Sequence, residues 1–193
     1  MAIVAIAPIN HHRSSIRVFT TRMRLTADKY CDGESDVNML HLKARFVITN
    51  ISERAAILYV SPTVSRILVS NDESAFRAGL YEVDMSPFTM TSQPAPSLSE
   101  KVFIDVKPHG SYSHDYPGVL PIPVSAEGSA KPGMIGAGSH VISVVLETWP
   151  FDTAQLSLWT SRLSKRGPLF SDVLVTVATA FEVARNPTVS KCD

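Results

Sequence analysis

The chain has 193 residues, 45% of them hydrophobic, and its 18 Lys and Arg residues balance its 18 Asp and Glu residues. This hydrophobic fraction suffices for a closed core, so the composition excludes a disordered chain, and the length suits one large domain. Because charges of one sign form no block, the sequence predicts no nucleic-acid or anionic-membrane partner.

The N-terminal run MAIVAIAPI, residues 1–9, is too short to span a bilayer and contains Pro8. It lacks the basic start and the small-residue cleavage site of a secretory signal. Two interpretations stay open: a remnant of an export signal, or a tail that could add an edge strand, and we favour the tail. We assign residues 1–14 and 188–193 to terminal tails and residues 15–187 to a single domain.

A first strand is predicted over residues 16–25, with a bulge or a crossing between sheets where its apolar face changes between Val18 and Phe19. Residues 26–38 are predicted as a loop. The acidic segment DGESD, residues 32–36, could supply oxygen ligands for Ca²⁺. It lacks the glycine and the distal Glu of an EF-hand loop, so we interpret it as a solvated acidic cluster.

The strand pattern is clearest in residues 42–60, LKARFVITNISERAAILYV. Apolar Leu42, Phe46 and Ile48 share one parity, and polar side chains take the other, which is the period of a strand with one buried face. The polar break at residues 50–54 predicts a hairpin or a corner. Its glycosylation sequon, Asn50-Ile51-Ser52, is interpreted as a tight turn.

The next segments are shorter. Residues 64–70 are predicted as a strand, followed by a helical turn that Asn71 or Asp72 would cap and Gly79 would end. Residues 80–90 have the pattern of an irregular edge strand.

Two long Pro-rich stretches, residues 85–99 and 117–138, are predicted as loops, with a strand at residues 102–106 and a turn at residues 108–110 between them. Irregular loops of this length inside a compact domain are functional or disordered. A strongly strand-like run, residues 140–149, follows the second loop.

A helix is predicted over residues 152–166, and Asp152 with Gln155 forms its capping box. One face of this helix carries an apolar stripe, Leu156, Trp159 and Leu163. A long last strand is predicted over residues 173–183 from Val173, Val175, Val177, Phe181 and Val183. Seven to nine strands, one short helix between the last two strands and no βαβ alternation predict an all-β, antiparallel two-sheet sandwich.

Three segments resemble bacterial immunoglobulin-like sandwich domains: FVITNISERAAILY (46–59), VKPHGSYSHDY (106–116) and AGSHVISVVLE (137–147). Their turn pattern is similar to that of the intracellular-proteinase-inhibitor-like family and related uncharacterised bacterial proteins. The resemblance implies an immunoglobulin-like β-sandwich. None of that family's inhibitory residues is carried over to this chain.

Cys31 and Cys192 match no metal or redox spacing. In immunoglobulin-like sandwiches the first and last strands commonly run side by side and parallel, which would bring both cysteines to one end and permit a disulfide. A cysteine one residue from the C-terminus is more often a frayed free thiol, and that is our expectation.

The chain contains no nucleophile elbow, phosphate loop, dinucleotide-binding glycine pattern or zinc spacing. His109, His114 and Asp115 lie around one turn, and with His140 they make a zinc-like ligand set, although exposed turn histidines are ordinary. We assign no catalytic, cofactor-binding or metal residue. An aromatic and aliphatic group around the helix is interpreted as a satellite core rather than a partner-binding patch: Trp149, Phe151, Trp159, Leu163 and Phe170.

These observations predict a non-enzymatic binding or accessory module whose long loops, residues 117–138 and 85–99, contact a protein partner. One alternative is a proteinase-inhibitor-like protein that presents one of these loops, extended and exposed, to a protease. Another is a metal-dependent protein built on His109, His114 and His140, which requires their ring nitrogens to converge.

Overall fold

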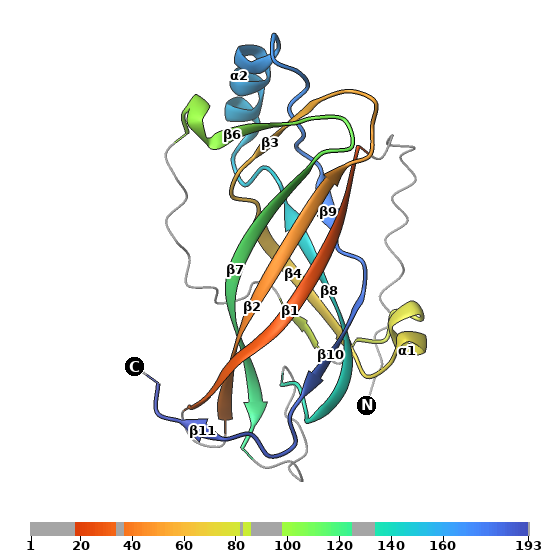
Figure 1. Cartoon of the computed structure of the whole chain (residues 1–193), viewed down its shortest axis with the longest axis vertical. Coiled ribbons are helices and arrows are strands. Elements are labelled where there is room, and N and C mark those ends of the chain that lie inside the picture. Colours follow the sequence, from red (N-terminus) through yellow and green to blue (C-terminus); the bar gives the residue numbers. More distant parts are fainter. Residues whose placement is uncertain (1–17, 34–36, 82, 86–97, 125–133, 193) are drawn as a thin grey trace.

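The computed structural model describes residues 18–33, 37–81, 83–85, 98–124 and 134–192, and within them the chain is mostly β (Figure 1). The helical elements are α1 (Glu73–Arg77), the 3₁₀ turn η1 (Glu100–Val102) and α2 (Thr153–Leu163). The strands are β1 (Phe19–Asp32), β2 (Val37–Asn50), β3 (Ala56–Tyr59), β4 (Thr63–Ser70), β5 (Val83–Met85), β6 (Phe103–Val106), β7 (Ser111–Pro123), β8 (Gly138–Glu147), β9 (Val173–Val175), β10 (Thr179–Val183) and β11 (Val189–Ser190).

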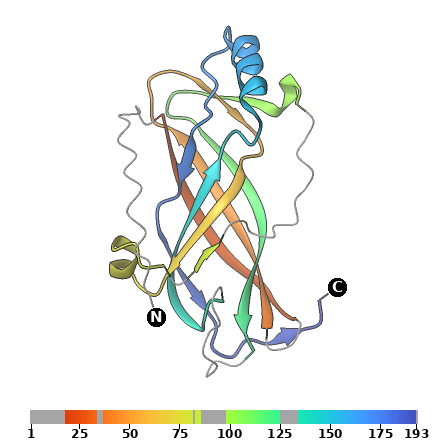
Figure 2. The same ribbon diagram turned by 180° about the vertical axis from the view of Figure 1, so that it is seen from behind.

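Two sheets form the body of the molecule. One has the order β11-β1-β2-β7, and the other has the order β10-β8-β4-β5 with β9 also paired to β8. The first sheet lies in front in Figure 1, and its strands cross those of the second sheet behind it. Figure 2 shows the molecule from the back, with the second sheet in front. The all-β prediction is confirmed, and the pairings are antiparallel except that β11 runs parallel to β1.

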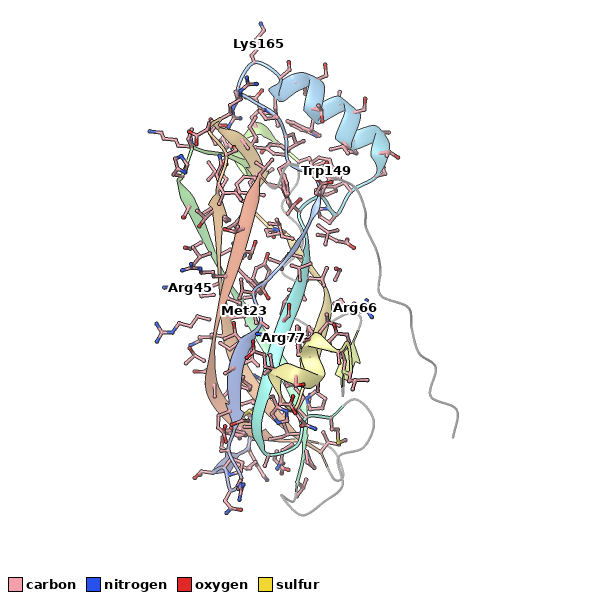
Figure 3. All side chains as sticks on the ribbon, turned by 90° about the vertical axis from the view of Figure 1, so that its right-hand side faces the viewer. Met23, Arg45, Arg66, Arg77, Trp149 and Lys165 are labelled. Carbon is pink, nitrogen blue, oxygen red and sulfur yellow. A yellow bond between two sulfur atoms is a disulfide. The ribbon has the colours of Figure 1, made fainter. Side chains whose placement is uncertain are left out.

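The main core lies between these sheets, because each contributes the apolar face of its strands. Phe46 and Ile48 of β2 are buried against Ile67 of β4 and Ile142 of β8. Polar β2 residues of the other parity, such as Arg45, point to solvent, whereas Met23 of β1 lies between the layers (Figure 3). The predicted alternation in β2 is therefore confirmed.

The predicted long last strand is divided, and its first half has the opposite face buried. Val173, Val175 and Val177 are exposed, while Leu174 and Thr176 are buried. Thr176 lies in the chain between β9 and β10, and its hydroxyl accepts a hydrogen bond from the Val144 N–H of β8 at 2.9 Å. The next residue bonds across to the other sheet, since the Val177 N–H donates to the Thr21 carbonyl at 3.1 Å. Because the chain crosses to the other sheet at this point, even-numbered residues are buried before the crossing and odd-numbered residues, Phe181 and Val183, after it. A single alternating pattern over residues 173–183 therefore does not describe this segment.

Residues 117–123 were predicted as loop and instead form the second half of β7, paired with β2 from Val37 to Lys43. β7 is an edge strand, which can accept proline where the missing N–H would face away from the sheet. The Pro121 carbonyl accepts a hydrogen bond from the Ile135 N–H, so this residue's backbone polar groups face outward. Pro117 and Pro123 have the same parity, and none of the three removes a bond to β2.

The loop predicted over residues 26–38 is also largely strand. β1 continues to Asp32 and β2 begins at Val37. A register shift between Ala27 and Lys29 leaves Asp28 as a bulge. The pairing from Phe19 to Ala27 is unbroken, so the bulge predicted between Val18 and Phe19 is not found there.

A corner, not a hairpin, connects β2 to β3, because β3 pairs with β6 in a separate two-stranded sheet. Asn50 organises the corner from a fully buried position. Its Nδ2 donates to the carbonyls of Arg54 (2.8 Å) and Val106 (2.9 Å), and its Oδ1 accepts from the N–H and hydroxyl of Ser52. The tight-turn interpretation of the sequon is confirmed.

Both predicted helical segments are present, which makes two helices instead of one. Asp72 caps α1 through the Ala75 N–H, and Gly79 follows with a φ of 73°. Asp152 caps α2 by accepting from the Gln155 N–H at 2.7 Å, as the capping-box pattern predicts.

Some predictions lie outside the described residues. These concern residues 1–9, most of the acidic segment at 32–36, residues 86–97 of the first long loop and residues 125–133 of the second.

Candidate functional site

One end of the sandwich collects the features with chemical or recognition potential, and we call it the disulfide end. Here β1 ends at Asp32, β7 ends at Pro123, β8 begins at Gly138 and β10 ends at Val183. All of these strand ends lie at the lower end of the molecule in Figure 1, together with β11. Residues from both sheets therefore surround the stem of the loop between β7 and β8.

This loop stem is fixed on both sides. Ile135 is fully buried in the main core, and its N–H donates to the Pro121 carbonyl at 3.2 Å. The buried ring of His140 donates from Nε2 to the Gly136 carbonyl at 2.8 Å. Gly138 has a φ of 123°, a backbone conformation that side-chain-bearing residues rarely adopt. The loop thus leaves the sandwich from a defined base.

Cys31 and Cys192 form a disulfide, so the expectation of a free thiol is wrong. The arrangement that would permit the bond is present, because β11 pairs in parallel with β1 and places Ser190 beside Cys31. Their Cα atoms are 5.4 Å apart, within the usual range for disulfides. The segment predicted as a C-terminal tail is covalently joined to the first strand.

His41 completes a cluster with the two cysteines that the sequence did not reveal. Atoms of Cys31, His41 and Cys192 that could bind a metal all lie within 4.8 Å of one another. Cys31 pairs with Met39 across the β1–β2 ladder, and His41 lies two residues further along β2, so both project from one face of the sheet. The proximity of His41 to the cysteines could be predicted only from the pairing register of β1 and β2, and the bulge at Asp28 sets that register near Cys31.

The three predicted histidines are placed differently. His109 lies in the β6–β7 turn, where its Nε2 is 3.4 Å from the Glu53 carboxylate, and His140 bonds to the loop stem. His114 faces inward from β7, whereas Asp115 faces outward and forms a bidentate pair with Arg45 at 2.7 Å. The potential metal-binding group found within the described part of the chain is Cys31, His41 and Cys192, without these histidines.

A row of polar aromatic side chains on the inner face of β7 holds the chain between β3 and β4. The Tyr112 hydroxyl donates to the Val60 carbonyl at 2.7 Å, and the Tyr116 hydroxyl donates to the Pro62 carbonyl. His114 lies between them, with Nδ1 3.1 Å from the Tyr112 oxygen. Burial lowers the pKa of His114, and the Asp115 carboxylate partly offsets this effect. The row closes the β7 edge of the sandwich.

The opposite end is closed by a second core under α2. Trp149, Trp159 and Leu163 are buried there against Tyr59 and Phe103 of the small sheet. The satellite-core interpretation is confirmed for these residues. Phe170 instead packs against Phe19 of the main core, with ring centroids 4.8 Å apart.

A cavity of about 20 Å³ lies between the sheets, lined by apolar side chains that include Leu25, Phe46, Ile67 and Leu120. This volume is about that of one water, and its apolar lining would leave it dry. It is far below the size of a small-molecule pocket.

No protein-family model and no curated protein matches this chain. Among solved structures, the chain is similar to one titled "X-ray structure of Northeast Structural Genomics Consortium target SoR45", with 10% sequence identity and a TM-score of 0.39 over 86% of each chain. In the described residues, no helix is long and apolar enough to cross a membrane.

Proposed function

We propose that this chain is a non-enzymatic, immunoglobulin-like β-sandwich that binds a protein partner through the loop between β7 and β8. One observation carries the proposal: both sides of this loop are fixed at the disulfide end, by Ile135 bonded to Pro121 and by His140 bonded to Gly136. A loop on a rigid base loses less conformational entropy on binding than one whose base is free.

The position of the stem strengthens this proposal. A row of paired residues crosses the first sheet from Ser190 through Cys31 and Met39 to Pro121, whose carbonyl holds Ile135. The disulfide thus lies in the same cross-strand row as the loop stem. Residues 85–99 remain a second proposed contact region, and Leu98 at its end packs against the second core.

The test replaces residues 125–133 with a Gly-Ser linker of equal length, which keeps Pro121, Ile135 and His140. Immobilised wild-type chain and the variant are compared for the proteins they retain from an extract, and each retained protein is then purified and titrated directly by calorimetry. The control, Leu158→Ser, changes an exposed residue of α2 at the opposite end. We expect the control to bind as wild type does and the linker variant to lose binding.

Equal binding by the linker variant would refute this contact surface. The proteinase-inhibitor-like alternative uses the same variant with a panel of purified proteases. Inhibition of a protease by wild-type chain, lost in the linker variant, would assign that function instead of an accessory role.

A further inference from the structure

We propose that reduction of the Cys31–Cys192 disulfide converts this corner of the sandwich into a Zn²⁺ site, with the two cysteine sulfurs and a His41 ring nitrogen as ligands. The site is separate from the loop proposed to bind a protein. It rests on the convergence of three ligand atoms from β1, β2 and the segment after β11.

The donor set suits the metal. Thiolate and imidazole are the usual ligands of Zn²⁺, with bonds of about 2.3 Å to sulfur and about 2.0 Å to nitrogen. Tetrahedral ligands at these distances lie roughly 3.5–3.8 Å apart. The atoms of Cys31, His41 and Cys192 lie within 4.8 Å of one another, and the two sulfurs are bonded in the oxidised chain. On reduction the sulfurs must move apart by roughly 1.5–2 Å, and the His41 nitrogen must come closer to them by up to about 1 Å, to reach these separations. Three protein ligands leave a fourth position for water.

His41 is available for this role. Cys31 is buried and the other two ligands are partly exposed, so the cluster lies just below the surface with access from solvent. Among the residues that the structure describes, no hydrogen bond or ion pair occupies the His41 ring. By contrast, His109 is near Glu53 and His114 near Tyr112.

Contacts other than the disulfide keep Cys192 in place after reduction. β11 pairs with β1 at Val189 and Ser190, and the Ser190 hydroxyl donates to the Tyr30 carbonyl at 3.4 Å. The Ala184 N–H donates to the Tyr30 hydroxyl at 3.0 Å, which fixes the chain leading to β11. The third ligand therefore stays near the first two.

The chemistry balances in two steps. A dithiol reductant supplies two electrons and two protons to the S–S bond and leaves as its own disulfide, so the chain then carries two thiols. Zn²⁺ then binds both sulfurs as thiolates and releases their two protons, while His41 binds as neutral imidazole. The oxidised chain offers disulfide sulfurs, which are not thiolate ligands, so metal binding and the disulfide exclude each other.

The experiment uses the full chain, oxidised or reduced, under anaerobic conditions. Zn²⁺ affinity and stoichiometry are measured by competition with a chromophoric chelator, and Co²⁺ reports thiolate coordination through its sulfur-to-metal charge-transfer absorption. We expect reduced chain to bind one Zn²⁺ with two thiolates, and oxidised chain to bind none. Replacing the ring ligand, His41→Ala, should weaken binding by at least about tenfold.

The matched control is His109→Ala, an exposed histidine at the other end, which should bind as wild type does. Circular dichroism of each reduced variant checks that it is folded. Two results would overturn the proposal: Zn²⁺ binding to the reduced chain no stronger than to the Cys31→Ala/Cys192→Ala variant, or His41→Ala binding as tightly as wild type. Neither result depends on the loop between β7 and β8.

Discussion

Removing the disulfide with Cys31→Ala/Cys192→Ala should strongly lower the free energy of unfolding. The bond joins residues 161 positions apart, so it closes almost the whole chain in the unfolded state. The chain-entropy relation for a loop of this length gives a stabilisation of about 5 kcal/mol at 25 °C. This is comparable to the whole stability of many domains, which is roughly 5–15 kcal/mol. Cys31 is itself buried, so its replacement by Ala adds a small loss of packing in the folded state.

The assay is equilibrium unfolding in urea for the oxidised wild type, the wild type with a thiol reductant and the double variant. We expect the reduced wild type and the double variant to agree and both to lie well below the oxidised protein. Reductant should not affect the double variant, which provides the control. A difference under about 1 kcal/mol would refute the chain-entropy reasoning for this bond.

Three further changes test the rest of the fold. Asn50→Ala removes four hydrogen bonds from a fully buried corner and should cost about 2–4 kcal/mol in urea unfolding. Asn50→Asp should cost at least as much, because it buries a carboxylate against the carbonyls of Arg54 and Val106, which need a donor. Trp159→Ala should cost about 3–5 kcal/mol by emptying the second core, and Leu158→Ala on the exposed face of α2 should cost well under 1 kcal/mol. His114 has a lowered pKa in the folded state, so unfolded chain binds its proton more readily and stability falls as pH drops below about 6.5. His114→Gln should flatten this part of the curve of melting temperature against pH, and an unchanged slope would contradict the assignment.

Local patterns predicted the parts of the fold that depend on neighbouring residues. The alternation in β2 and the cap of α2 by Asp152 each arise within a few positions of sequence, and both are present. β7 could not be predicted in this way. Whether Pro117 and Pro121 interrupt a strand depends on which side of it pairs with β2, and a distant strand sets that pairing.

The candidate site depended even more on long-range register. Cys31 and Cys192 were visible in the sequence, but His41 joins them only because β1 and β2 pair with a bulge at Asp28. Long-range pairing also decides the position of Val175, a β-branched apolar residue that was predicted to lie in a core strand but is exposed. Its exposure follows from the crossing at Val177, where the chain bonds to β1.

The two ends of the sandwich are stabilised by different physical means. Under α2, aromatic burial around Trp149 and Trp159 closes the end without any covalent bond. At the disulfide end, β11 is two residues long and exposed, so backbone pairing and a few hydrogen bonds position the C-terminal segment beside β1 with little apolar burial. The covalent link to Cys31 adds to these contacts, and it lies in the row that leads through Met39 to the loop stem. The disulfide end is therefore the end whose stability can respond to a change in redox conditions.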